Sequence, residues 1–318
     1  MIVSAKDVEQ ARALLGQYLR PTRLVSAESL ARRSGVRVYL KIESDLPTGS
    51  FKPRGALNAL LTSAAQCTLP GVVAASTGNH GAAVAYAARI AKVGATIFLP
   101  ENPNPVKRAR IVALGANVVE RGALGQTAAS EGATEFAREY GHYFLDDASD
   151  PLVPAGTATI ASEILDEIPT PDVIFVPMGD TALIRGVAVE AKRRHPDVRI
   201  VGVQAEQAPA YVRSWQEGRV VVTDSCDTIA EGLARLHPLE ANVIAIRELV
   251  DEVRLVSERE LLDAIRVLLL DEHVVAEAAG AAATAAFLQD PAPHADANVI
   301  LLVTGANLSP EVLRRVVM

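Results

Sequence analysis

Cysteine and long apolar segments are both scarce in this sequence. The 318 residues include two cysteines, Cys67 and Cys226. Two cysteines cannot form a disulfide framework, and such scarcity is typical of a reducing compartment, so we expect a cytoplasmic protein. The most apolar late stretch, 276–288, is mostly alanine and contains Glu277, so it is too short and too weakly apolar to span a membrane. The first residues are charged and do not resemble a signal peptide.

An excess of positive charge is also missing. The chain has 31 lysine and arginine residues against 38 aspartate and glutamate residues, a formal net charge of -7. This balance argues against nucleic acid or an anionic membrane as the main partner. The composition, with 49% hydrophobic and 22% charged residues, is ordinary for a globular protein, and the length suits two lobes better than one.

Strand-like and helix-like segments alternate through most of the chain. Short apolar segments typical of buried strands lie at 71–76, 95–100, 117–120, 142–145, 173–176, 200–203 and 299–303. Segments with helical character lie between them, at 79–93, 105–115, 126–140, 159–168 and 181–194. This order predicts an α/β fold with parallel sheets and helices on both faces. Ligands bind such folds beyond the carboxyl ends of the strands, so residues there are the site candidates.

Lys52 is notable because of its neighbours. The segment 36–43 alternates as a strand does, and Pro53, directly after the lysine, suits the first turn of a helix. We therefore expect Lys52 on a short loop where a helix begins. Partial desolvation and the positive end of the helix would both lower its pKa, which makes an amine a usable nucleophile toward a carbonyl. Taken alone, it would more simply be a solvated surface lysine.

Three further strand ends carry polar or glycine-containing loops. The loop at 76–81 combines hydroxyls, glycine and an amide at a helix start, which favours a carboxylate ligand; alone, it also fits an ordinary helix cap. The loop at 177–182 offers N–H groups and the Thr181 hydroxyl to a phosphate, or is a plain turn. Thr304 follows the last strand, where a turn hydroxyl is the simpler interpretation.

Together these segments resemble one family. The sequence is similar to the fold-type II pyridoxal-phosphate enzymes of the serine/threonine dehydratase and serine racemase group. The motifs occur in the family's order over nearly the whole chain, at 50–56, 76–81, the Gly179 loop, 227–232, Glu277 and 304–307. The resemblance implies pyridoxal 5'-phosphate as cofactor and a small-molecule amino acid as substrate.

The resemblance also implies a two-domain architecture like that of the tryptophan synthase β subunit. Each domain would be an open, mostly parallel sheet flanked by helices. The large cofactor-binding domain would comprise residues 1–70 and 149–318, and the small domain, 71–148, would carry the asparagine loop for the substrate carboxylate. Homodimers are usual in the family.

Residue roles follow from the same resemblance. Lys52 would hold the cofactor as a Schiff base and, once freed, remove the α-proton of the substrate. The other expected cofactor contacts are Phe51 against the ring, Asn79 at the phenolic oxygen, Gly179, Asp180, Thr181 and Ala182 at the phosphate, and Thr304 at the pyridine nitrogen. The expected substrate contacts on the asparagine loop are Ser76, Thr77, Gly78, Asn79 and His80.

The implied reaction is β-elimination from a hydroxyamino acid such as L-threonine or L-serine, which yields a 2-oxo acid and ammonia. A hydroxyl at Thr304 makes the ring a weaker electron sink than a carboxylate would, which suits prompt loss of the β-substituent. Racemisation is an alternative, but serine racemases place a serine where Thr77 stands, and the extra methyl crowds that face. Two further alternatives are a β-replacement synthase and a relative that binds the cofactor but has lost turnover.

The phosphate loop departs from the family pattern. Relatives usually carry a run of glycines there, whereas Asp180, Thr181 and Ala182 follow Gly179 in this chain. Asp180 has the same sign of charge as phosphate unless it points away, and side chains restrict how closely the backbone can approach. Thr181 offers a hydroxyl donor in compensation.

A second departure concerns metal ions. Several relatives bind a divalent cation through acidic residues after the strand that corresponds to 200–203. Here the matching positions are Gln204 and Ala210, and Glu206 stands alone nearby. Because a hard cation needs several oxygen ligands, we predict no tight metal site.

Arg235 falls where relatives carry a small or polar residue near the β-substituent of the substrate. An arginine there would favour an anionic side chain such as that of 3-hydroxyaspartate. The favoured interpretation is a surface arginine or one that neutralises the phosphate.

Overall fold

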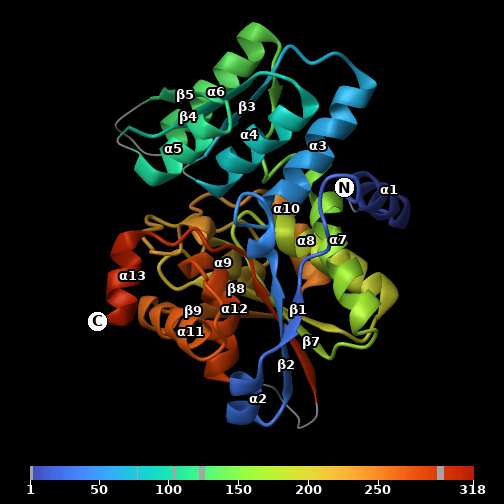
Figure 1. The fold of residues 1–318 in the computed structure, drawn as a ribbon, viewed down its shortest axis with the longest axis vertical. Helices are drawn as coiled ribbons and strands as arrows, with labels where there is room; N and C mark the ends of the chain where they lie inside the picture. The colour runs from blue at the N-terminus through green and yellow to red at the C-terminus, as the bar shows by residue number, and fades with distance from the viewer. Residues whose placement is uncertain (1–2, 77, 102, 104, 122–125, 292–296) are drawn as a thin grey trace.

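The computed structural model describes residues 3–76, 78–101, 103, 105–121, 126–291 and 297–318. These residues form two sheets, each flanked by helices (Figure 1). The upper group of elements in Figure 1 contains a four-stranded sheet and the lower group a six-stranded sheet. The predicted α/β class with mostly parallel, helix-flanked sheets is confirmed. The domain boundaries given above remain a prediction.

The larger sheet gathers strands from both ends of the chain, in the order β1-β2-β10-β7-β8-β9. Its strands are β1 Leu24–Ser26, β2 Arg37–Ile42, β7 Val173–Pro177, β8 Arg199–Ala205, β9 Glu252–Val256 and β10 Asn298–Val303. β1 is antiparallel to β2, and the other pairings of these described strands are parallel. Because β2 and β10 are parallel neighbours, the loops that follow them meet: the Phe51 N–H donates to the Thr304 carbonyl at 3.0 Å.

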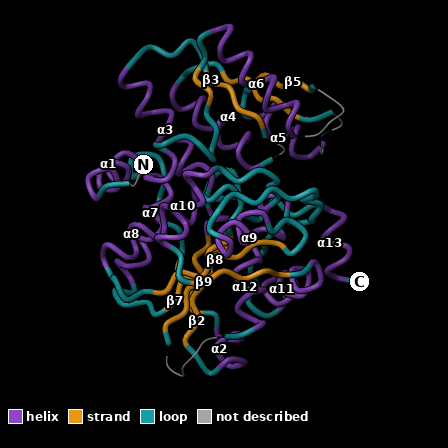
Figure 2. The backbone as a smooth tube through the Cα atoms, turned by 180° about the vertical axis from the view of Figure 1, so that it is seen from behind, coloured by secondary structure: helices purple, strands orange, loops and turns teal. Residues whose placement is uncertain are grey.

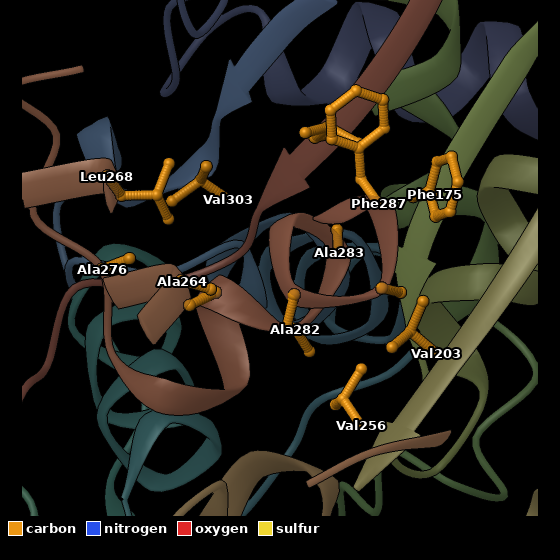
Figure 3. Close-up of a cluster of buried hydrophobic side chains, with 14 of the residues drawn as sticks. Phe175, Val203, Val256, Ala264, Leu268, Ala276, Ala282, Ala283, Phe287 and Val303 are labelled. Atoms are coloured by element: carbon orange, nitrogen blue, oxygen red, sulfur yellow. The ribbon is translucent and has the colours of Figure 1, made fainter. Parts of the chain in front are cut away.

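Helices cover both faces of the larger sheet. One face carries α7 Val153–Glu167, α8 Ala182–Arg194, α9 Ala210–Glu217 and α10 Glu240–Leu249. The other carries α2 Glu28–Ser34, α11 Glu258–Leu270, α12 Ala278–Gln289 and α13 Pro310–Val317. Figure 3 shows Ala282 and Ala283 of α12 within this core, close to Val203, and Phe287 lies edge-on to Phe175 with ring centroids 6.1 Å apart. The alanine-rich stretch is therefore a core helix whose small side chains allow close packing on the sheet.

The smaller sheet is entirely parallel in its described strands, with the order β5-β4-β3-β6. Its strands are β3 Val72–Ala75, β4 Ala95–Leu99, β5 Asn117–Glu120 and β6 Tyr143–Phe144, and its helices are α4 Asn79–Ala91, α5 Pro105–Ala113 and α6 Gln126–Tyr140. Alternate residues of β3 face opposite sides: Val72 and Ala74 pack in the α4 core, and Val73 packs with α6. This alternation is the period-two pattern of a strand buried on both faces.

Helix α3, Lys52–Gln66, lies between the two groups, as the opposite views of Figures 1 and 2 show, and packs against α4 and α7. Pro53 occupies its first turn, as predicted. The remaining helical elements are α1 Ala5–Leu15 and two short 3-10 helices, η1 Glu43–Asp45 and η2 Glu231–Leu233. No helix in the described part of the chain has the length and apolar character needed to cross a membrane.

Helix α7 corrects one prediction. We expected a helix over 159–168, but α7 begins at Val153. Pro154 and Gly156 made the earlier residues resemble a loop. In the structure Pro154 lies in the first turn, where proline is tolerated, and Gly156 allows close contact with α3: a Cβ there would lie 2.3 Å from the Arg54 carbonyl oxygen.

Candidate active site

A pocket of about 790 Å³, part of it open solvent, lies where the carboxyl ends of strands from both sheets meet. The pocket brings together most of the residues predicted from sequence: Phe51, Lys52, Ser76, Gly78, Asn79, His80, Gly179, Asp180, Thr181, Arg235 and Thr304. Ala182 does not line it, and Thr77 lies outside the described residues.

Lys52 is the first residue of α3, and its side chain is only 12% exposed. Its ammonium forms ion pairs with Asp147 and, at 3.0 Å, with Asp180. Burial lowers the pKa of Lys52, but these two carboxylates outweigh burial and the net pKa is raised. The predicted lowering of this pKa is therefore wrong for the protein without cofactor, because two carboxylates adjoin the amine.

Asp147 is a pocket residue that the sequence interpretation missed. It follows β6 and Leu145 at a strand end, the same signal that identified the other loops. Burial would raise the pKa of Asp147, but His80, Lys52 and Arg235 together hold it well below its ordinary value. His80 Nδ1 is 3.5 Å from this carboxylate, while its Nε2 donates to the Leu145 carbonyl at 2.8 Å. Asp147 is thus a fixed negative charge inside the pocket.

Asn79 is held firmly by two partners. Its Nδ2 donates to Glu277 Oε1 at 2.5 Å, and its Oδ1 accepts from Asn307 Nδ2 at 2.6 Å. Burial raises the pKa of Glu277, whose role was not assigned from sequence. Gly78 is the N-cap of α4 and has no side-chain cap bond, while Ser76 Oγ accepts from the Gly78 N–H at 3.1 Å. Ser76 therefore orders the loop without capping the helix.

The loop between β7 and α8 packs closely against the backbone of η2. A Cβ on Gly179 would lie 2.2 Å from the Gly232 carbonyl oxygen, so only glycine fits there. Thr181 is the N-cap of α8 with φ +77, and its hydroxyl accepts from Arg185 Nε at 3.1 Å. Asp180 Oδ1 accepts from the Ala182 N–H at 3.1 Å, at the positive end of the helix.

Arg235 lines the pocket, and its side chain is 23% exposed. Its guanidinium is 3.3 Å from Asp180 and 3.7 Å from Asp147. The arginine therefore already has two carboxylate neighbours before any ligand binds.

The remaining predicted ring contacts are Phe51 and Thr304. The Lys52 ammonium is 5.0 Å from the centroid of the Phe51 ring. Thr304 follows β10, and its hydroxyl is 3.5 Å from the Ala279 carbonyl. Both residues line the pocket.

Further polar contacts cross the pocket region between the groups of elements. Lys107 of α5 forms an ion pair with Glu231 of η2, and both line the pocket. Arg110 of α5 donates to Asn307, which follows β10.

One position discussed as a possible metal ligand, Gln204, is already hydrogen-bonded within the protein. Gln204 is buried, and its Oε1 accepts from the Val212 N–H at 3.0 Å. Within the described ranges, no three histidine, cysteine, aspartate or glutamate side chains gather as a metal site. The absence of a tight metal site remains a prediction.

The pocket fits a ligand with a carbonyl and an anionic group. Lys52 supplies an amine, and the α8 N-terminus with Gly179 supplies the anion cradle. A sequence model of the family described as "Pyridoxal-phosphate dependent enzyme" matches residues 15–305. The chain belongs to this family. The pyridoxal-phosphate cofactor would thus be held by Lys52 and the α8 loop, with Arg235 as counter-charge to Asp180.

Two proteins of similar sequence indicate to which group within this family the chain belongs. An "L-threonine ammonia-lyase" of Thermotoga maritima is 34% identical over 316 residues, which cover 99% of this chain and 78% of that protein. An "L-threonine dehydratase catabolic TdcB" of Staphylococcus aureus strain N315 is 35% identical over 312 residues, 96% of this chain and 90% of that one. The predicted membership of the serine/threonine dehydratase group is confirmed.

Solved structures agree with the sequence relatives. Maize serine racemase superposes with a TM-score of 0.93 at 28% identity, covering 99% of this chain and 97% of that one. The processed form of threonine deaminase isoform 2 from Solanum lycopersicum has a TM-score of 0.90 at 28% identity, covering 99% of this chain and 94% of that one. The fold-type II architecture is therefore shared over the whole chain.

Proposed function

We propose that the protein is an ammonia-lyase that eliminates the β-hydroxyl of an amino acid such as L-threonine or L-serine, releasing a 2-oxo acid and ammonia. The observation that carries the proposal is the position of Lys52, in one pocket with the asparagine loop and the α8 loop. The relatives named L-threonine ammonia-lyase, at about one-third identity, support the same reaction. Pyridoxal phosphate, when bound, supplies an electron sink that acidifies the α-proton of the substrate.

Lys52 is assigned two tasks, to hold the cofactor and to take the α-proton. Ser76, Gly78, Asn79 and His80 are assigned to the substrate carboxylate, and Thr77 is proposed with them from sequence. The helix α4 begins at Asn79, so its positive end favours a carboxylate at this loop. The proposed cofactor contacts are Phe51, Asn79, Gly179, Asp180, Thr181, Ala182 and Thr304.

Substitution of Lys52 tests the proposal. Lys52→Ala should lower 2-oxo acid formation from L-threonine or L-serine by more than about a thousandfold, because both assigned tasks are lost. Lys6→Ala, an exposed lysine of α1, is the matched control and should keep wild-type activity. Wild-type rates in the Lys52 variant, with cofactor present, would contradict the proposal.

Racemisation is a second candidate, favoured by the close superposition on maize serine racemase. We place elimination first because serine racemases carry a serine where this sequence has Thr77. The extra methyl group of the threonine would crowd the face of the substrate opposite Lys52. Chiral analysis of residual serine decides the order: D-serine that forms faster than pyruvate would place racemisation first.

We also propose that the enzyme acts in the cytoplasm as a homodimer. Both cysteines, Cys67 and Cys226, are free thiols in the structure, which agrees with a reducing compartment. Sedimentation at several concentrations measures the mass, and a particle of about 34 kDa would contradict the dimer, since one chain is 33.6 kDa.

A further inference from the structure

Two buried carboxylates adjoin the lysine of the active site. The side chains of Asp147 and Asp180 are 6% and 4% exposed, and both pair with the Lys52 ammonium. They come from different parts of the fold, Asp147 after β6 and Asp180 after β7. Buried carboxylates without matching cations are costly, so their charge balance indicates which ligands the pocket accepts.

The charge balance depends on Lys52. While its amine is protonated, Lys52 and Arg235 offset Asp147 and Asp180. A lysine that takes the α-proton must first be neutral. In that state Arg235 and the His80 ring, whose Nδ1 is 3.5 Å from Asp147, are left to offset two carboxylates. The other acidic residues of the pocket are engaged elsewhere: Glu231 pairs with Lys107, and Glu277 accepts from Asn79. With neutral Lys52, the pocket can therefore accommodate one additional positive charge beside Asp147 and Asp180.

We infer that the pocket also accepts amino acids with a cationic β-amino group, of which 2,3-diaminopropionate is the smallest, and eliminates that group as ammonia. The inference rests on the proposed function, because it uses the same lysine as base. It assigns Asp147 and Asp180 to hold the β-ammonium beside Lys52. A charge-assisted hydrogen bond of this kind is among the stronger polar contacts.

The chemistry balances without any further reagent. 2,3-Diaminopropionate and one water give pyruvate and two molecules of ammonia. The Cα–H and Cβ–N bonds break, the α-proton goes to Lys52, and the β-nitrogen leaves with the bonding electron pair as neutral ammonia. Hydrolysis then releases the α-nitrogen as the second ammonia. An ammonium leaves without a proton donor, whereas a hydroxyl requires one, and the ionised Asp147 cannot supply a proton.

An anionic β-substituent is a poorer match for this pocket. Arg235 is the residue that would bind the second carboxylate of a substrate such as 3-hydroxyaspartate. Its guanidinium already lies between Asp180 and Asp147. A carboxylate brought to Arg235 would therefore approach two like charges in a buried site.

The first test uses the wild-type enzyme with its cofactor. Pyruvate and ammonia are measured from L-2,3-diaminopropionate and from L-serine, which differ only in the β-substituent and give the same 2-oxo acid. We expect kcat/KM for diaminopropionate to exceed that for serine by about tenfold or more, the usual effect of a hydrogen bond to a buried charge. Two ammonia molecules should form per pyruvate from diaminopropionate and one from serine.

The second test removes one charge. Asp147→Asn should reduce the ratio of kcat/KM for diaminopropionate to that for serine by about tenfold. Asp180→Asn is a second variant with the same expectation. Asp146→Asn is the matched control, since the Asp146 carboxylate accepts from Ser149 and does not line the pocket. Its ratio should stay within about twofold of wild type.

The outcomes separate the inference from the proposed function. Pyruvate from serine but none from diaminopropionate would overturn the inference and leave the ammonia-lyase proposal standing. An equal loss of both activities in the Asp147 variant would also overturn it, because Asp147 would then act only on Lys52. No 2-oxo acid from serine, threonine or diaminopropionate would overturn both.

Discussion

Two carboxylates, which follow strands of different sheets, determine the protonation state of Lys52. Asp147 reaches it from the end of β6 and Asp180 from the end of β7, and together they outweigh the effect of burial on its pKa. An amine attacks a carbonyl only when neutral. The protein without cofactor therefore holds its lysine in the unreactive, protonated form at pH values where a less acidic pocket would release it.

This charge arrangement predicts the pH dependence of cofactor attachment. The raised pKa of Lys52 means that attachment to the apoprotein should become fast only as the pH rises. Asp147→Asn removes one stabilising charge, so the midpoint should move to lower pH by about one unit. The change in cofactor absorbance after mixing, followed at a series of pH values, measures the midpoint. Asp146→Asn serves as control, and an unchanged midpoint in the Asp147 variant would contradict the assignment.

Gly179 makes a separate prediction at the residue scale. A methyl group there would lie 2.2 Å from the Gly232 carbonyl oxygen, and both partners are backbone and cannot rotate away. Gly179→Ala should therefore destabilise the protein by about 1–3 kcal/mol and weaken cofactor binding. Gly94→Ala is the control, because a Cβ at Gly94 meets nothing within 4 Å. Thermal unfolding and cofactor titration measure both effects, and equal behaviour of the two variants would exclude a close contact at Gly179.

At the scale of elements, helix α3 is anchored by a buried charge network. Arg54, two residues after Lys52, contacts Glu43 of η1 at 2.7 Å and Glu163 of α7 at 2.6 Å. Lys41 of β2 contacts the same Glu163 at 2.6 Å. Burial lowers the pKa of Arg54, but Glu43 and Glu163 outweigh burial and raise it. The network ties the start of α3 to the strand and helix on either side of it.

Breaking this network should lower the free energy of unfolding more than breaking an ion pair on the surface. Arg54→Met leaves Glu43 and Glu163 partly uncompensated, and we expect a loss of about 3–5 kcal/mol in the free energy of unfolding. Arg259→Met removes an arginine that is 93% exposed and pairs with Asp263 at 3.8 Å, so it should change stability by less than about 0.5 kcal/mol. Chemical denaturation of both variants gives the comparison, and similar midpoints would mean that the network does not anchor α3.

The same elements show how far the sequence predicted the fold. Alternation of strands and helices indicated the parallel sheets, and strand ends identified Lys52, Asn79, Gly179 and Thr304, which the structure brings into one pocket. The pairing of β2 with β10 was not predictable, because no local pattern joins strands so far apart in the chain. Asp147 also follows a strand, but its cationic neighbours Lys52 and Arg235 come from distant parts of the chain, so no local pattern indicated its role.

At the scale of the whole molecule, the pocket is built from both groups of elements, so cofactor binding should stabilise them together. Removal of the cofactor should lower the unfolding temperature by roughly 5 °C, because a ligand at a hundred times its Kd adds about 2.7 kcal/mol. Lys52→Ala should reduce this difference, since the covalent link is lost. Calorimetry with and without cofactor measures both, and an unfolding temperature independent of cofactor would contradict a site between the groups.

The ion pair between Lys107 and Glu231 has a consequence for the contact between the two groups of elements. Both residues line the pocket, one from each group of elements, and the Glu231 side chain is 49% exposed. Contacts between partly exposed charges weaken as salt screens them, over a length of about 8 Å at physiological ionic strength. The strength of this contact between the two groups of elements is thereby linked to the ionic strength of the surrounding solution, although the charges around Lys52 are more deeply buried.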